Sequence, residues 1–255
     1  MLRLAVAEQR TEIYYDMATN LAQTATGLAC WCCHQPVSAH FCSSCGKIQA
    51  AQPTDYFSFF SLPRKLNIDL PKLEREFYRL SRKLHPDIFA RVSADEQEWS
   101  TEKTSQLNDA YRALKDPIAR TEYLLELEGV KLEEQSRSAT DAARQIGAEK
   151  KQVVPPDLLE EVFELNMQLE EMRMSKKIGE DDPNVVRDLQ QARQHFEQKF
   201  SELTTELQRY WDEWDALVPA GTEQARIRVR DKMVGLLNRR SYIRNLVRDV
   251  NEALK

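Results

Sequence analysis

The stretch that decides the fold reads LPKLEREFYRLSRKLHPD and covers residues 70–87. Its apolar residues are spaced by four, three and four, which puts them on one narrow stripe of a helix: Leu73, Phe77, Leu80 and Leu84. Basic residues occupy the opposite side of the same helix: Arg75, Arg79, Arg82 and Lys83. The stretch ends in His85-Pro86-Asp87, where the proline ends the helix. We therefore predict an amphipathic, basic helix that runs directly into a loop.

Further helix signals follow this stretch. Ser93 and Glu96 have the spacing of a capping box, which opens the next helix. Asp116-Pro117 ends that helix and starts another, and Gly129 is a natural stop. No alternating strand pattern of useful length occurs after residue 53. The predicted fold class is therefore mainly α.

The composition excludes several classes of protein. The chain has 255 residues, which suggests one or two domains, and its 42% hydrophobic content is enough for packed cores. Seven glycines and ten prolines argue against collagen-like and turn-rich all-β chains. No apolar run approaches the ~18–20 residues of a membrane helix. A net charge of −5 argues against a strongly basic nucleic-acid-binding protein.

All five cysteines lie between positions 30 and 45, in the order Cys30-Trp31-Cys32-Cys33 and Cys42-Ser43-Ser44-Cys45. Paired Cys-x-x-Cys turns supply a tetrahedral set of four thiolates, so we predict a structural zinc site at Cys30, Cys33, Cys42 and Cys45. Cys32 is left over. The alternatives are iron in place of zinc, redox cysteines, a pair of disulfides, and His34 or His40 as substitute ligands.

Residues 157–255 have an almost wholly helical pattern, with breaks near Gly179–Pro183 and at Pro219-Ala220-Gly221, which predicts a three-helix bundle. The first of these helices carries two apolar stripes. One consists of Leu158, Val162, Leu165, Leu169 and Met172, and the other of Leu159, Phe163 and Met167, bordered by Glu160, Glu164 and Glu171. The second stripe is covered inside the bundle or left for a partner. The last helix is basic, which charge complementarity with its neighbours explains more simply than nucleic-acid binding.

The combination of these motifs resembles the J domain over residues 55–128: a basic helix, His85-Pro86-Asp87, a capped helix containing Asn108-Asp109-Ala110-Tyr111, and Asp116-Pro117. Asp55-Tyr56-Phe57 and the segment Arg120 to Leu125, with an upstream Cys-Trp-x-Cys…Cys-x-x-Cys domain, are similar to HscB-type J-proteins. This family acts as a co-chaperone in iron–sulfur cluster assembly. Ile88-Phe89 departs from the pattern of many J-proteins, which have a basic residue after the motif.

The resemblance implies a non-enzymatic protein that stimulates ATP hydrolysis by a DnaK- or HscA-type chaperone. The residues implied in that contact are Arg75, Arg79, Arg82, Lys83, His85, Pro86 and Asp87. It also implies that an IscU-type iron–sulfur scaffold protein binds the C-terminal bundle. The implied scaffold-binding residues are Leu159, Glu160, Phe163, Glu164, Met167, Glu171 and, on the last helix, Tyr242. An acid–base role for His85 and Asp87 lacks a third orienting residue.

The expected organisation has five parts: an unassigned tail at 1–29, a four-cysteine zinc domain at 30–53, a J domain at 54–130, a linker or insertion at 131–156, and the helical bundle at 157–255. Two other functions stay open, a J-protein for another client and a four-cysteine protein that carries metal or electrons. We expect a bacterial cytoplasmic location, with the mitochondrial matrix as the alternative, because the first 29 residues include acids and lack a signal pattern.

Overall fold

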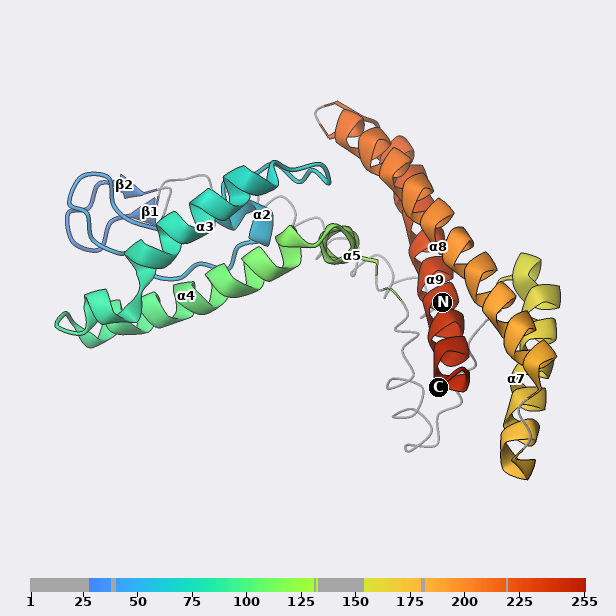
Figure 1. Ribbon diagram of the computed structural model, residues 1–255. Helices are drawn as coiled ribbons and strands as arrows, with labels where there is room; N and C mark the ends of the chain where they lie inside the picture. Colours follow the sequence, from blue (N-terminus) through green and yellow to red (C-terminus); the bar gives the residue numbers. More distant parts are fainter. Residues whose placement is uncertain (1–27, 38–39, 131, 133–153, 180–181, 219) are drawn as a thin grey trace, which may run out of the picture. The chain divides into compact units, whose positions relative to one another are not determined.

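The computed structural model describes residues 28–37, 40–130, 132, 154–179, 182–218 and 220–255 (Figure 1). In these residues the chain is helical apart from two short strands and connecting loops, which confirms the predicted mainly α fold. The tail and linker predicted at 1–29 and 131–156 lie almost wholly outside the described residues. No helix in the described part is long and apolar enough to cross a membrane.

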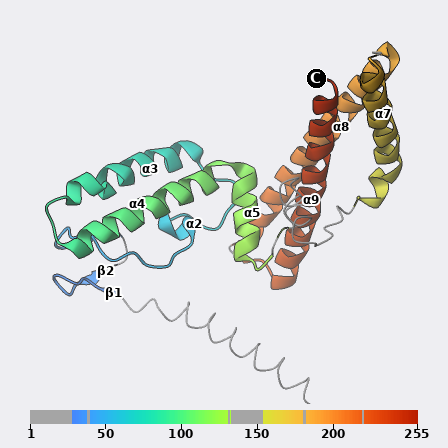
Figure 2. The ribbon, with the colours of Figure 1, turned by 90° about the horizontal axis from the view of Figure 1, so that it is seen from below.

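The chain divides into two compact units, one of residues 1–60 with 71–112 and one of residues 61–70 with 113–255. The first unit contains β1 (Leu28–Ala29), β2 (Pro36–Val37), α2 (Tyr56–Phe59), nearly all of α3 (Leu70–Leu84), the 3-10 turn η1 (Pro86–Phe89) and most of α4 (Ala94–Lys115). β1 and β2 pair antiparallel. Figure 2 shows α3 and α4 side by side and antiparallel, joined by the loop that holds the His-Pro-Asp motif.

The predicted apolar stripe of α3 is confirmed with one difference. Leu73, Leu80 and Leu84 are buried, whereas Phe77 is only half-buried. Phe77 instead stacks on Tyr111 of α4, with ring centroids 4.1 Å apart. An aromatic pair of this kind stabilises the helix contact at the edge of the core, where a ring keeps part of its surface in water.

The start of α4 follows the predicted capping box. The backbone N–H of Glu96 donates to Ser93 Oγ at 3.4 Å, and Ser93 Oγ donates to Glu96 Oε2 at 3.2 Å. One and two turns later, two hydroxyl groups of α4 donate to the same carbonyl at the end of α3. Ser100 Oγ is 2.6 Å and Thr104 Oγ1 is 3.0 Å from the oxygen of Leu84. These bonds fix the last residue before His85 to α4.

The second unit contains α5 (Pro117–Leu127), the 3-10 turn η2 (Pro156–Leu158), α7 (Leu159–Ile178), α8 (Pro183–Leu217) and α9 (Glu223–Ala253). The helix ends lie where the sequence predicts them. Asp116 and Asp182 cap α5 and α8, each with a proline next in the chain, and Gly179 ends α7 with φ 73°. Only glycine adopts such a left-handed φ without strain, so the helix stops there.

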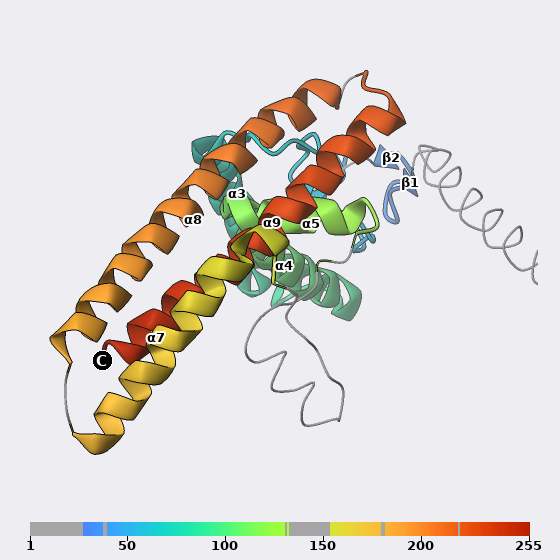
Figure 3. The same ribbon diagram turned by 90° about the vertical axis from the view of Figure 1, so that its right-hand side faces the viewer.

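Figure 3 shows α7, α8 and α9 packed as a three-helix bundle with short connections, as predicted. One stripe of α7 is buried in this bundle: Leu158 just before it, then Val162, Leu165, Leu169 and Met172. α8 and α9 contribute further buried apolar residues to the bundle, among them Leu189, Phe196, Leu207, Met233, Ile243 and Val250. In the basic last helix, Arg240 lies over the ring of Phe200 at 4.2 Å, so part of that charge packs inside the bundle.

The loop at 61–69 is fastened to α5 and α8 by polar contacts. Arg120 is buried and donates to the carbonyl oxygens of Leu66, at 2.8 Å, and Leu114. Asp215 accepts from the backbone N–H groups of Leu66 and Asn67 at 2.6 and 2.8 Å. A loop held by a guanidinium on one side and a carboxylate on the other has its backbone groups satisfied, and Leu66 is fully buried.

We predict that removing both hydroxyl groups that hold Leu84 destabilises the first unit. Ser100→Ala with Thr104→Val leaves the buried Leu84 carbonyl without these donors, which typically costs about 1–3 kcal/mol. Amide hydrogen exchange of α3 and α4 measures this loss locally. The control is Thr101→Ala, because Thr101 is exposed and bonds only within its own helix, to the Gln97 carbonyl. Equal exchange rates in the double variant and the control would contradict the prediction.

Candidate functional site

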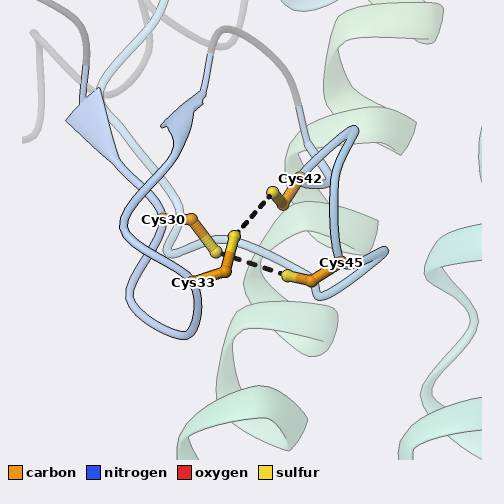
Figure 4. A group of neighbouring side chains, drawn as sticks. All are labelled: Cys30, Cys33, Cys42 and Cys45. Carbon is orange, nitrogen blue, oxygen red and sulfur yellow. Dashed lines mark hydrogen bonds between the residues drawn. The ribbon is translucent and has the colours of Figure 1, made fainter.

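Four cysteine side chains converge at one end of the first unit (Figure 4). The sulfur atoms of Cys30, Cys33, Cys42 and Cys45 all lie within 4.8 Å of one another. The Cys30–Cys45 and Cys33–Cys42 sulfur pairs are 3.6 and 3.5 Å apart. A tetrahedral ion with bonds of about 2.3 Å needs sulfur atoms about 3.8 Å apart. The four thiols therefore fit a closed, four-coordinate metal site.

The two Cys-x-x-Cys turns repeat the same local structure. Cys30 N donates to Gln35 O at 2.8 Å, as Cys42 N does to Lys47 O at 2.9 Å. In each turn a backbone N–H two residues on, from Cys32 or Ser44, points to the first sulfur at 3.4 Å. The fourth residue after each first cysteine has a positive φ: 74° at Gly46 and 61° at His34. Glycine adopts such a φ without strain, whereas it is uncommon for a residue with a side chain such as His34.

The surroundings of the four thiols also shift their pKa values. Burial alone would raise the pKa of Cys30, but backbone N–H groups of Cys33 and Cys32 and the neighbouring thiols bring it down to about 6. The N–H of Lys47 would lower the pKa of Cys45, whereas desolvation and the three nearby thiols raise it to about 12. The backbone N–H of Cys45 is the main cause that lowers the pKa of Cys42, so a bound metal ion would displace protons chiefly from Cys33 and Cys45, whose pKa values are raised.

The alternative ligands do not join this cluster. His40 Nε2 lies 3.1 Å from the Phe59 carbonyl oxygen, and its ring packs on Phe59 with centroids 4.4 Å apart. Burial and the nearby charge of Lys103 lower the pKa of His40, so it stays neutral at pH 7. Cys32 and His34 are exposed and lie outside the four-sulfur group. The five cysteines are free thiols in the structure, with no disulfide among them.

Several contacts join the cysteine turns to α4. Sequence patterns did not indicate them. Lys47 Nζ donates to both carboxylate oxygens of the buried Glu96, at 3.0 and 3.2 Å. The ring of Trp31 meets that of Trp99 edge-on with centroids 5.8 Å apart, and Trp31 Nε1 donates to Ile48 O at 2.8 Å. Since Glu96 also caps α4, the cysteine turns are anchored to the first turns of that helix.

The His-Pro-Asp loop is exposed but locally ordered. Pro86 starts η1, a 3-10 turn where the sequence predicted only a loop, because proline fixes φ and Ile88 N donates to His85 O at 3.0 Å. His85 Nδ1 accepts from the backbone N–H of Asp87 at 3.3 Å, and both side chains face solvent. Phe89 is buried and Ile88 exposed, so the residue after the motif offers an apolar surface.

The four basic residues predicted on the outer side of α3 are all exposed: Arg75, Arg79, Arg82 and Lys83. Arg79 is paired within its helix, with Nε 2.7 Å from Glu76 Oε2. Among the described residues, no acidic group pairs with Arg75, Arg82 or Lys83 at 4 Å or less. This basic face and His85 therefore lie on one helix and the loop that follows it, available to an acidic partner.

The second stripe of α7 is exposed. Leu159, Phe163 and Met167 have 55%, 66% and 60% of their surface accessible, although large apolar side chains usually lie inside. Glu160, Glu164 and Glu171 border the stripe and are exposed as well. Of the two alternatives that the sequence left open, coverage inside the bundle is therefore wrong, because the stripe lies in solvent. Tyr242 differs, because it is buried in α9 and offers no exposed aromatic surface.

The acidic border of α7 continues toward α8. There a cavity of about 310 Å³ is lined by Glu161, Glu164, Gln168, Asp188 and His195 among others. Glu161 is tied down by Lys199 Nζ at 2.7 Å and His195 Nε2 at 3.0 Å. Burial would raise the pKa of Glu161, but these two partners lower it. Glu164 is exposed and has no such partner in the described residues.

Curated relatives agree on one family, although no protein-family model matches the chain. The Mus musculus protein "Iron-sulfur cluster co-chaperone protein HscB" is 37% identical over 111 residues, which cover 41% of this chain and 47% of the relative. "Co-chaperone protein HscB homolog" of Shewanella halifaxensis is 33% identical over 153 residues, which cover 60% of this chain and 76% of the relative. The chain belongs to the HscB family.

The fold agrees with this family. The crystal structure of human co-chaperone protein HscB aligns with a TM-score of 0.55 at 23% identity and covers 88% of this chain and 98% of that one. The chain spans about half the length of the mouse and human HscB proteins that it matches in sequence. Within this chain, the residues singled out from the sequence form three separate features: the cysteine turns, the His-Pro-Asp loop with α3, and the exposed stripe of α7.

We predict that the four-sulfur group holds one metal ion per chain and that Cys32 does not contribute to it. Cys33→Ser removes one of four converging ligands, so metal content falls from about one ion per chain to near zero, and the cysteine turns lose their structure. Cys32→Ser is the matched control, one residue away on the exposed side of the same turn. Elemental analysis of purified protein measures both. Metal retained in Cys33→Ser but lost in Cys32→Ser would overturn the ligand set.

Proposed function

We propose that this HscB-family chain is a co-chaperone in iron–sulfur cluster assembly, which links a DnaK- or HscA-type ATPase chaperone to an IscU-type iron–sulfur scaffold protein. The observation that carries the proposal is the exposed apolar stripe of α7 in a chain that also presents a His-Pro-Asp loop. The His-Pro-Asp loop would serve the chaperone, and the stripe of α7 would serve the scaffold protein. The protein itself carries out no chemical step, so it regulates a reaction performed by the chaperone.

The chaperone contact is assigned to α3 and the loop after it, through Arg75, Arg79, Arg82, Lys83, His85, Pro86 and Asp87. A basic helix face attracts an acidic partner and raises the rate of association. The loop adds specificity, because its geometry is set in advance by Pro86 and by the two hydroxyl groups that hold Leu84. Little conformational entropy is then lost when the chaperone binds.

The scaffold contact is assigned to the face of α7 formed by Leu159, Glu160, Phe163, Glu164, Met167 and Glu171. Exposed leucine, phenylalanine and methionine side chains in one row are typical of a protein-binding surface. The bordering carboxylates favour a partner with basic residues around an apolar patch. Tyr242 is left out of the contact surface, because its side chain is buried.

The metal at the cysteine turns is assigned as zinc in a structural role. Four thiolates complete a tetrahedral set and leave no open position for a substrate. Cys30, Cys33, Cys42 and Cys45 would hold the ion, and the Lys47–Glu96 contact would carry its stabilising effect into α4. A metal- or electron-carrying protein is the competing function, and red colour with visible absorption in the purified protein would favour it. The proposed location is the bacterial cytoplasm, with the mitochondrial matrix as the alternative.

We predict that His85→Gln abolishes stimulation of the partner ATPase while the protein stays folded. His85 is exposed, so its replacement removes no core packing. Steady-state ATP hydrolysis by the chaperone, with and without the variant, measures the effect, and circular dichroism verifies the fold. His195→Gln on α8 is the control, since it is also an exposed histidine but lies far along the chain from the motif. Full stimulation by the folded His85→Gln protein would rule out the J-domain mechanism.

We predict that Leu159→Ala with Phe163→Ala abolishes scaffold binding and leaves stability unchanged. Exposed side chains typically change stability by no more than about 0.5 kcal/mol, whereas apolar anchors of an interface cost about 2 kcal/mol or more in binding. The control is Leu165→Ala on the buried side of the same helix, which should lose about 2–5 kcal/mol of stability.

Thermal unfolding and calorimetric titration with purified scaffold protein are done on the same samples. Unchanged scaffold affinity in the stable double variant would place the client site elsewhere. Binding of an unrelated client with no scaffold binding by the wild type would favour a J-protein of another pathway.

A further inference from the structure

The exposed apolar row of α7 continues beyond the residues assigned to the scaffold contact. Met174 and Ile178 are 61% and 72% accessible. At about 100° per residue, they fall in the same arc of roughly 100° as Leu159, Phe163 and Met167. The helical spacing of this row can be seen in the sequence, because Met174 follows Met167 by seven positions and Ile178 follows Met174 by four. The apolar row therefore runs along the whole helix.

The length of the apolar row indicates whether a partner would contact part of α7 or the whole helix. At about 1.5 Å per residue, Leu159 to Met167 extends only about 12 Å along the helix. A specific interface buries about 800 Å² on each partner, which corresponds to a patch about 30 Å across. From Leu159 to Ile178 the row extends about 28 Å. The full row matches a standard interface in length, and the first three residues alone do not.

Charges along this face change sign from one end to the other. Acidic residues border the row up to Glu171, among them Glu160 and Glu164, and the last turn has Lys176 and Lys177. Lys176 Nζ donates to the carbonyl of Ala253 at 2.8 Å, so it is turned toward the end of α9. Lys177 falls on the side of the apolar row and has no acidic partner within the described residues. Between the two groups of apolar residues, Glu170 pairs with Arg173.

We propose that the iron–sulfur scaffold protein covers the whole length of α7, with Met174 and Ile178 as a second apolar anchor. The partner surface that fits this face is apolar along its middle, basic opposite Glu160 and Glu164, and acidic opposite Lys177. The charge order fixes the direction in which the scaffold lies along the helix. This inference rests on the proposed function, because it extends the footprint of the same client.

The test is a calorimetric titration of Met174→Ser with Ile178→Ser against purified scaffold protein without cluster. Affinity should fall about tenfold, while the melting temperature and the stimulation of the ATPase in the absence of scaffold stay unchanged. Ile227→Ser on α9 is the control, because Ile227 is an exposed apolar residue outside this face. The control variant should bind the scaffold protein with the affinity of wild type. Lys177→Glu should also weaken binding, most strongly at low salt.

The outcomes separate the inference from the function that it extends. Wild-type affinity in Met174→Ser with Ile178→Ser, alongside loss of binding in Leu159→Ala with Phe163→Ala, would end the footprint at Met167 and overturn the inference alone. Tighter binding by Lys177→Glu would overturn the proposed charge order. If the serine variant instead converts a dimer to a monomer in sedimentation without changing scaffold affinity, the occupant is a second copy of this chain. No scaffold binding by wild type would refute the proposed function itself.

Discussion

α8 and α9 can bury only one side of α7. The opposite side of α7 is therefore part of the surface of the second unit. α8 and α9 are 35 and 31 residues long and pack on each other, whereas the 20 residues of α7 lie against them along one stripe. Every large apolar residue on the other side is then left in water. A monomeric protein gains no stability from such a row, and an exposed apolar row of this kind is the surface to which we assign the scaffold protein.

The first unit presents its surface in a different way. The His-Pro-Asp loop is short, and its position is set by the carbonyl of Leu84, which accepts hydrogen bonds from Ser100 and Thr104 of α4. α4 in turn is fastened at its first turn by Glu96, which is shared between Ser93 and Lys47 of the cysteine turns. The metal site, the capping box and the His-Pro-Asp loop are therefore connected by hydrogen bonds through one helix. A metal ion bound at the four cysteines would stabilise this arrangement without touching either of the two proposed partner surfaces.

Features that depend on local sequence were predicted well. The capping box at Ser93, the stop at Gly179 and the paired cysteine turns each need only a few neighbouring residues, and helical periodicity separated Leu158 and Val162 from Leu159 and Phe163. Contacts between distant residues were missed, because nothing at Lys47, Arg120 or Asp215 signals its partner tens of residues away. Tyr242 shows a related limit. Its helical position suits either the bundle or a partner surface, and only packing with the neighbouring helices buries it.

We propose that one chain joins two partners through two surfaces, the His-Pro-Asp loop with α3 and the exposed stripe of α7. Single-turnover ATP hydrolysis by the chaperone tests it most directly, in three mixtures: chaperone alone, chaperone with this protein, and chaperone with this protein and the scaffold. The account predicts that the rate rises in the second mixture and rises further in the third. Equal rates in the first and second mixtures, or no increase from the second to the third, would contradict it.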